Sequence, residues 1–184
     1  MEQDGATLVQ GLQSRDPEVL DHLIGMYQHR LLRYLLSLTA SRSMAEDLFQ
    51  ETWLHVLERG HQYRSQWKFE VWLFSIARHL VIDEARRKKG ASLDELAETD
   101  EGPRFQPASA GPSPLEEVVA GQEGDRIAHH LSRLPAVYRE VLILRFREDL
   151  ALEEIATIIS APLSTVKSRL YRAVETLRRT MSRP

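Results

Sequence analysis

The sequence predicts an all-α protein made of two small helical domains joined by a flexible acidic linker. Apolar residues recur at three- and four-residue spacing on both sides of residues 90–125, and no stretch alternates with a period of two for long enough to suggest a sheet. Residues 91–114 are rich in proline, glycine, serine and acids, which is linker composition. Near the C-terminus, a short apolar helical pattern, a tight turn and a cation-rich helical pattern follow one another, as in a helix-turn-helix.

The N-terminal domain is expected to hold three main helices. The first begins after Asp16–Pro17, an N-cap followed by proline at the first helical position. The run Ser43–Met44–Ala45–Glu46 has the form of a capping box and predicts the start of a second helix, which ends near Gly60. A polar loop over 61–66 and a third helix over about 68–89 follow. The second helix is expected to bury Leu48, Phe49, Thr52, Trp53, Val56 and Leu57.

The C-terminal domain is expected to hold four helices. Ser113–Pro114 resembles another helix start, and the periodicity then predicts helices near 115–133, 136–147, 152–159 and 163–180. The turn between the last two is Ser160–Ala161–Pro162. These boundaries divide the chain into a domain over 1–89, a linker over 90–125 and a domain over 126–184.

Length and composition limit the classes of protein. The 184 residues can form one medium domain or two small ones, and the lack of cysteine excludes disulfides and thiolate metal sites. The N-terminus lacks the basic start and apolar run of a secretion signal, and no stretch of about 18 apolar residues occurs. A soluble, cytoplasmic protein is therefore expected.

The formal net charge of −3 conceals an uneven distribution. Residues 1–89 have net charge 0, residues 90–125 have −8, and residues 126–184 have +5. Because the local distribution of charge decides which surface attracts phosphate, the basic C-terminal domain remains suited to nucleic acid.

The second helix of the helix-turn-helix has the residues needed to read duplex DNA. Lys167, Ser168, Tyr171 and Arg172 lie along one side of this helix. The inward stripe consists of Val166, Leu170, Val174 and Leu177. A lysine or arginine in the major groove can bond guanine O6 and N7, whereas Arg169, Arg178 and Arg179 are better placed for phosphates. The alternative is an ordinary basic amphipathic helix in a bundle.

Aromatic and cationic residues are interleaved before and along the third helix. The cluster comprises Tyr63, Arg64, Trp67, Phe69, Trp72, Phe74, Arg78, His79 and the cationic run 86–89. Rings stack on unpaired bases and cations follow phosphates, so this composition suits single-stranded nucleic acid. The alternatives are that Trp72 belongs mostly to the core and that the cationic run is a solvated helix end.

An acidic face of the second helix is the third cluster, and enzyme chemistry is not expected. Asp47, Gln50 and Glu51 share an exposed face that is a protein docking surface, a metal site or a solubilising surface. No phosphate-binding glycine loop, dinucleotide fingerprint or HExxH motif occurs. His79 and Asp83 have i, i+4 spacing without an evident third ligand, and the adjacent His129 and His130 point to different faces. We therefore expect no catalytic residue, cofactor or metal site.

Together these clusters resemble the extracytoplasmic-function sigma factors, the small two-domain branch of the bacterial sigma factors. The resemblance covers about 14–89 and 126–180. In the N-terminal domain its motifs are Ala45 to Trp53, Trp72 to His79 and Asp83 to Arg87. In the C-terminal domain they are Leu134 to Val141, Leu144–Arg145, Leu152 to Ala156 and Thr165 to Leu170. Any one run is weak, but all of them in this order and spacing are highly specific.

The resemblance implies a role for each cluster in promoter-specific transcription initiation. It implies that Asp47, Gln50 and Glu51 dock on core RNA polymerase. It implies recognition and opening of the −10 promoter element by the loop 61–68 and the third helix, with the expected residues Tyr63, Arg64, Trp72, Arg78, His79, Arg86 and Arg87. It implies reading of the −35 element by Thr165, Lys167, Ser168, Arg169, Tyr171 and Arg172. The linker would thread through the polymerase, and an anti-sigma factor is an expected partner.

Three positions depart from the family pattern, and two other functions remain open at this point. His79 stands where asparagine is frequent, Ser75 where arginine is common, and Ser164 where glycine is frequent. One alternative is a helix-turn-helix regulator that binds a palindrome as a dimer without polymerase. The other is a helical adaptor that binds only protein.

Overall fold

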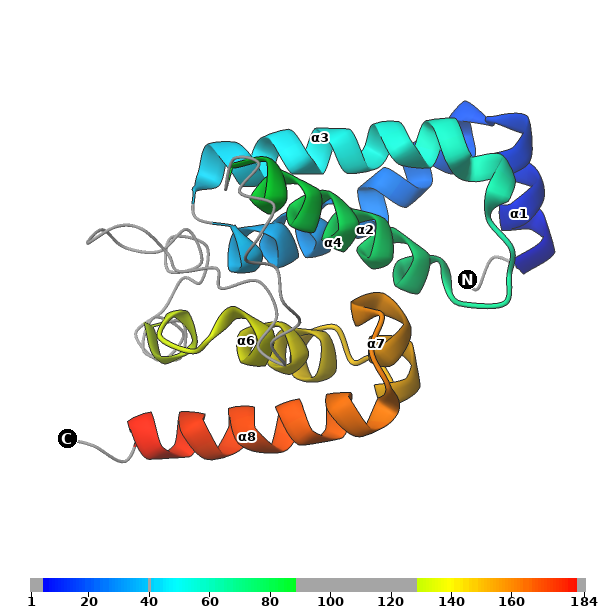
Figure 1. The fold of residues 1–184 in the computed structure, drawn as a ribbon. Helices are drawn as coiled ribbons and strands as arrows, with labels where there is room; N and C mark the ends of the chain where they lie inside the picture. The colour runs from blue at the N-terminus through cyan, green and yellow to red at the C-terminus, as the bar shows by residue number, and fades with distance from the viewer. Residues whose placement is uncertain (1–4, 40, 89–128, 182–184) are drawn as a thin grey trace.

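The computed structural model describes residues 5–39, 41–88 and 129–181, and within these ranges every regular element is a helix. Figure 1 shows two layers. The upper layer holds α1 (Gly5–Ser14), α2 (Pro17–Leu38), α3 (Arg42–Arg59) and α4 (Phe69–Lys88); the lower holds α6 (Ala136–Leu142), α7 (Leu152–Ile159) and α8 (Leu163–Met181). The predicted all-α class is confirmed. The predicted linker lies outside the described residues, as does most of the predicted helix 115–133, of which residues 129–132 are described and helical.

Helix α2 begins where the sequence predicts. The extended backbone of Asp16 places its Oδ1 2.9 Å from the backbone nitrogen of Glu18, which satisfies one of the free N–H groups of the first turn. Helix α1, which the periodicity did not predict, precedes α2 and buries Leu8 and Leu12.

The predicted capping box of α3 is wrong by two residues. The N-cap is Ser41, whose Oγ accepts a hydrogen bond from the backbone nitrogen of Met44 at 3.2 Å. Ser43 lies inside the helix, and Glu46 pairs with Arg42 at 2.9 Å instead of bonding a cap. The reason is local: Ser41 has the extended backbone (φ −146°) that a helix cap requires.

A dense aromatic and aliphatic core holds α2 and α4 together. The rings of Tyr34 and Phe74 meet edge to face with centroids 5.0 Å apart, and both side chains are fully buried. Leu31, Leu35 and Leu73 fill the space around them. Helix α4, close to its predicted bounds, therefore has one side fixed against the core.

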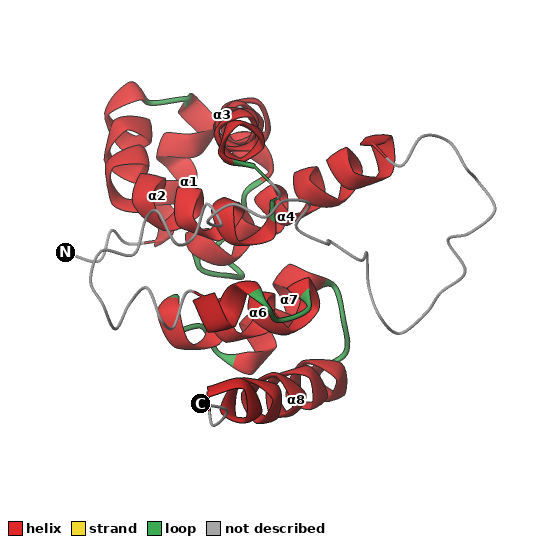
Figure 2. Ribbon diagram, turned by 90° about the vertical axis from the view of Figure 1, so that its left-hand side faces the viewer, coloured by secondary structure: helices red, strands yellow, loops and turns green. Residues whose placement is uncertain are grey.

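The lower layer follows the predicted order with one irregularity. The predicted helix 136–147 is α6 followed by η2 (Ile143–Arg147), a single turn of π-helix. This turn keeps Ile143 and Leu144 buried. Figure 2 shows α6 and α7 between α8 and the N-terminal helices, so one long side of α8 faces away from the other helices that the structure describes.

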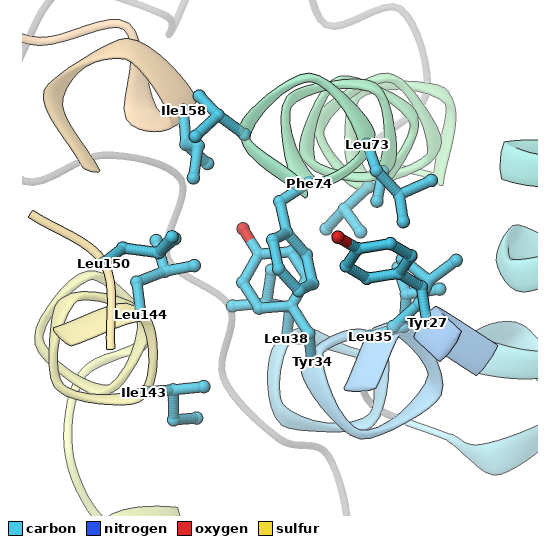
Figure 3. Close-up of a cluster of buried hydrophobic side chains, with 14 of the residues drawn as sticks. Tyr27, Tyr34, Leu35, Leu38, Leu73, Phe74, Ile143, Leu144, Leu150 and Ile158 are labelled. Carbon is cyan, nitrogen blue, oxygen red and sulfur yellow. The ribbon is translucent and has the colours of Figure 1, made fainter. Parts of the chain in front are cut away.

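The two layers share one hydrophobic core, although the sequence predicted separate domains on a tether. Figure 3 shows Leu144, Leu150 and Ile158 of the lower layer facing Tyr34 and Phe74 of the upper layer. All five side chains are fully buried. The apolar contact extends the core of each domain across the boundary between them.

Candidate nucleic-acid interface

The turn between α7 and α8 sets the geometry of the helix-turn-helix. Helix α7 ends at Ser160, which adopts the left-handed conformation at φ 51°. The next backbone nitrogen, that of Ala161, donates to the carbonyl of Ala156 at 3.1 Å, which closes the end of the helix. Pro162 then starts α8, because its carbonyl accepts from the backbone nitrogens of Thr165 and Val166. The predicted turn at 160–162 is thus confirmed.

Helix α8 has a buried side and an exposed side. Val166 and Ala173 are fully buried against the core, and three further apolar residues pack partly against it: Leu170, Val174 and Leu177. Ala173 was not predicted to face inward. The predicted inward stripe is thereby confirmed and widened by one small residue.

The exposed side of α8 carries the polar residues that the sequence predicted there. Lys167, Ser168, Tyr171 and Arg172 are all exposed, Tyr171 to 72%. Thr165 and Arg169 are half-buried at the margin of this side. An exposed helix face that carries cations and hydroxyls has the dimensions and the chemistry that fit a DNA major groove.

The aromatic residues before and at the start of α4 serve mostly to pack against one another and the core. Tyr63 is only 3% exposed, its ring lies 5.3 Å from that of Trp72 and 5.8 Å from that of Phe69, and its hydroxyl donates to the carbonyl of Trp67 at 3.0 Å. Burial raises the pKa of Tyr63, so its hydroxyl stays protonated. In this conformation Tyr63 is not accessible to a base; Trp67, 44% exposed, and the half-buried Trp72 offer the ring surface.

The polar residues of α4 divide between two sides. Arg78 points at the lower layer, where its Nε lies 2.9 Å from Glu140 Oε1. His79 is exposed, and its Nδ1 lies 2.6 Å from the carbonyl oxygen of Ser75. Since a carbonyl only accepts, Nδ1 carries the proton, and in the neutral ring Nε2 keeps an acceptor lone pair. The predicted −10 residues His79 and Arg78 therefore face different surroundings.

The end of α4 is an exposed cationic segment with local partners. Arg86 lies 3.6 Å from Asp83, and Arg87 lies 2.6 Å from Glu84. Both arginines are exposed, and Asp83 is exposed as well, so the Arg86–Asp83 pair is worth little in water, whereas the side chain of Glu84 is only 15% exposed. Arg86 can therefore exchange its carboxylate for a phosphate at small cost. Arg64, also exposed, bonds the carbonyls of His61 and Tyr63 and braces the loop.

Helix α3 presents the predicted acidic face together with two leucines that were not assigned to it. Asp47, Gln50 and Glu51 are exposed on one side. Leu54 and Leu57 continue this side one and two turns on and are 55% and 40% exposed, so the prediction that Leu57 is buried is wrong. The spacing Gln50, Leu54, Leu57 carried the signal. An acidic face bordered by exposed leucines is typical of a protein-docking surface.

In residues 5–39, 41–88 and 129–181 no group of three or more histidine, aspartate or glutamate side chains is placed to hold a metal ion. None of the helices described combines the length and the hydropathy of a membrane span.

Comparison with known families decides between the alternatives that the sequence left open. The description "Sigma-70 region 2" matches residues 23–91, and "Sigma-70, region 4" matches residues 125–177. The chain is 30% identical over 167 residues to the ECF RNA polymerase sigma factor SigW of Bacillus subtilis, with 89% of each chain covered. It is 33% identical over 164 residues to SigM of the same organism, with 86% of this chain and 93% of the relative covered. The chain belongs to the extracytoplasmic-function (ECF) sigma factors.

Solved sigma factor structures share the fold. A sigma factor RpoE from Bartonella quintana, crystallised with the anti-sigma factor NepR, matches with a TM-score of 0.67 and 22% identity, covering 89% of this chain and 96% of that one. CnrH, solved with the cytosolic domain of CnrY, matches with a TM-score of 0.66 and 17% identity, covering 96% of each chain. The function of this sigma factor is promoter-specific initiation of transcription. A stand-alone regulator or a protein-only adaptor does not fit these matches.

Proposed function

We propose that this sigma factor assigns one surface to each of three tasks: α8 reads the −35 element, the loop 61–68 with α4 opens the −10 element, and α3 holds core RNA polymerase. The domain bounds 1–89, 90–125 and 126–184 separate the readers. The observation that carries the proposal is the exposed polar side of α8, opposite a side locked into the core. The protein acts by binding alone, in the cytoplasm, and needs no cofactor.

At the −35 element the duplex stays intact and α8 enters the major groove. Lys167 and Arg172 are the base-reading cations, and a good bidentate contact discriminates against the wrong base by about 1–3 kcal/mol. Ser168, Tyr171, Thr165 and Arg169 supply contacts at the margin and to the backbone, which fix the register. Free promoter binding by one such helix is weak and strongly salt-dependent.

At the −10 element binding energy alone opens the strands. Each base-pair step costs about 1.4 kcal/mol of stacking. A base captured against an aromatic ring returns roughly 1–3 kcal/mol, so the protein can hold a short opening. With Nδ1 bonded to the Ser75 carbonyl, a neutral His79 ring offers Nε2 as an acceptor, which favours a base with an exocyclic amino group. Arg64, Arg86 and Arg87 follow the phosphates, while Tyr63 shapes the loop and supports Trp72.

Core polymerase sets the distance between the two DNA-reading surfaces, which the free chain does not set by itself. The exposed face of Asp47, Gln50 and Glu51, with Leu54 and Leu57, docks on the polymerase. Tethering then multiplies the affinities of two weak readers, provided that the spacing fits. We propose an anti-sigma factor as the partner that competes with core polymerase for this sigma factor.

Run-off transcription with purified core polymerase on a promoter library tests the proposal. Lys167→Ala and Arg172→Ala should each lose −35 dependence by about five- to 150-fold, the equivalent of about 1–3 kcal/mol, while still binding core. Glu175→Gln, an exposed neighbour on α8, is the matched control and should keep promoter choice. Unchanged promoter choice in both alanine variants would refute the reader helix, and failure of the wild-type chain to capture core polymerase would refute the function.

A further inference from the structure

The loop 61–68 begins next to a buried glycine, Gly60, where α3 passes into η1 (Gly60–Gln62). The carbonyl oxygen of Gly60 accepts a hydrogen bond from the backbone nitrogen of Tyr63 at 3.1 Å. In the same turn, Arg64 donates to the carbonyl of His61 at 2.9 Å. The position of Gly60 therefore sets the position of the first turn of this loop.

Gly60 provides space rather than a special backbone conformation. Its φ of −54° and ψ of −33° are right-handed helical values that any residue adopts. A Cβ at position 60, however, would lie 3.0 Å from the carbonyl oxygen of Leu12 and 3.4 Å from the Leu12 Cβ. The backbones of α1 and η1 can meet this closely only because glycine has no side chain.

Helix α1 is held on its other side by α2. A Cβ at Gly11 would lie 2.6 Å from Cγ2 of Val19, so these two helices also meet at a glycine. The carbonyl of Gly11 accepts from the backbone nitrogen of Asp16 at 2.9 Å, across a tight turn in which Arg15 has φ 56°. Gly11 and the buried Leu12 thus form a brace, the α1 brace, between α2 and η1. Figure 1 shows α1 beside the end of α3, where the chain turns toward α4.

The position of the loop matters because it carries the rings proposed to meet an unpaired base. Trp67 is exposed there, and the buried Tyr63 supports the ring of Trp72. A binding group must be held within about 0.5 Å of its productive geometry. A methyl group at position 60 would force the contact with Leu12 to give by a few tenths of an ångström, which is comparable to that tolerance.

We propose that Gly60 is a positioning residue for the −10 element, because it lets the α1 brace seat η1 at one fixed place and so determines where the loop 61–68 meets the opened strand. The proposal rests on the proposed function of that loop. A larger residue at position 60 should change binding to −10 DNA and leave binding to −35 DNA unchanged, since α8 belongs to the other domain.

Holoenzymes assembled from full-length chains and core polymerase test this difference. Fluorescence anisotropy measures binding to two probes taken from one promoter selected by run-off transcription: a single-stranded −10 oligonucleotide and a duplex −35 fragment. Gly60→Leu should weaken binding to the −10 probe by about fivefold or more, as expected for the loss of one captured base, and Gly60→Ala by about twofold. Gly25→Ala is the matched control and should change neither affinity, because Gly25 is exposed within α2 and a Cβ there meets nothing within 4 Å.

The ratio of the two affinities distinguishes positioning from a loss of stability. A variant that only unfolds more readily has a smaller competent fraction, which weakens binding to both probes by the same factor. Equal losses on the two probes, or an unchanged −10 affinity in Gly60→Leu, overturn the proposal. If circular dichroism shows that Gly60→Leu has lost helix, Gly60→Ala decides by the same two criteria.

A second pair of variants tests whether the effect passes through α1. Gly11→Ala adds its methyl group against Val19, on the side of α1 that meets α2, and should weaken −10 binding to the same extent as Gly60→Ala. Val19→Ala in the same chain removes the Cγ1 and Cγ2 atoms that this methyl group would meet, and should restore part of the loss. No loss in Gly11→Ala, or a loss that Val19→Ala leaves in full, overturns the role of the α1 brace.

Hydrogen exchange in the free chain separates this proposal from the proposed function. The backbone amides of residues 61–68, that of Tyr63 included, should exchange faster in Gly60→Leu than in the wild type or in Gly25→Ala, because the first turn of the loop loses its support. If the wild-type holoenzyme does not bind the −10 probe, the proposed function fails. Unchanged exchange of these amides in Gly60→Leu overturns the positioning role in either case.

Discussion

Removing the Tyr34 hydroxyl is a sharp test of how the layers are coupled. Tyr34 is fully buried, and its hydroxyl donates to Glu140 Oε1 at 2.9 Å. Burial and the nearby Glu140 carboxylate raise the pKa of Tyr34 well above its ordinary value, so the hydroxyl remains a donor. Tyr34→Phe keeps the ring contact with Phe74 and removes only this donor.

The expected loss follows from what remains at Glu140. A hydrogen bond to a charged acceptor contributes about 1.5–3 kcal/mol, and because Arg78 still pairs with the carboxylate, we expect the lower part of this range, about 1.5–2 kcal/mol. For a chain of this size each kcal/mol lowers the melting temperature by about 2–4 °C, so the fall should be about 3–8 °C.

Urea and thermal unfolding followed by circular dichroism measure this loss. The control is Tyr171→Phe, since that residue is 72% exposed and its hydroxyl is placed where water can replace any partner. The control should change the free energy of unfolding by less than about 0.5 kcal/mol. Equal stabilities of Tyr34→Phe and the wild type would refute the coupling between the layers through this bond.

Three further outcomes are expected. Ser160→Gly should raise the free energy of unfolding in urea by about 0.5–1 kcal/mol, because Ser160 has φ 51° and glycine adopts that conformation freely; a lower stability would contradict this. Above about pH 10, stability should fall by up to about 1.4 kcal/mol per pH unit for each of Tyr27 and Tyr34, because burial raises both pKa values and only the unfolded chain releases these protons; tyrosinate absorbance that rises before unfolding would count against it. Trp67→Ala should weaken holoenzyme binding to single-stranded −10 DNA by about 1–3 kcal/mol in fluorescence anisotropy, while its thermal unfolding stays near that of the wild type.

The helices and the reader face were predictable because they depend on local signals. Asp16 followed by proline marks the start of α2, and the three- and four-residue spacing along α8 separates Val166 from Lys167. The capping of α3 was misplaced because Ser41 and Ser43 are both competent caps in sequence, and backbone conformation decides between them.

The contact between the layers was not predictable from periodicity. Glu140 and Glu148 read as ordinary helix-surface acids, since nothing within a few residues of either reveals a partner more than 60 positions away. The burial of the Tyr63 ring could not be predicted for a related reason. An aromatic in a polar loop fits a base-stacking ring and a core wedge equally well, and only the neighbouring rings of Phe69 and Trp72 decide.

The apolar face shared by the layers has a consequence for the lifetime of the separated chain. When the two layers separate, four apolar side chains become exposed to water: Leu144, Leu150, Ile158 and Phe74. A contiguous exposed apolar surface of this kind promotes aggregation and proteolysis. We expect chains that have parted without finding transcriptase to be degraded or to aggregate faster than engaged ones, which limited proteolysis with and without core enzyme would reveal. The concentration of core polymerase would then determine how much of this sigma factor persists.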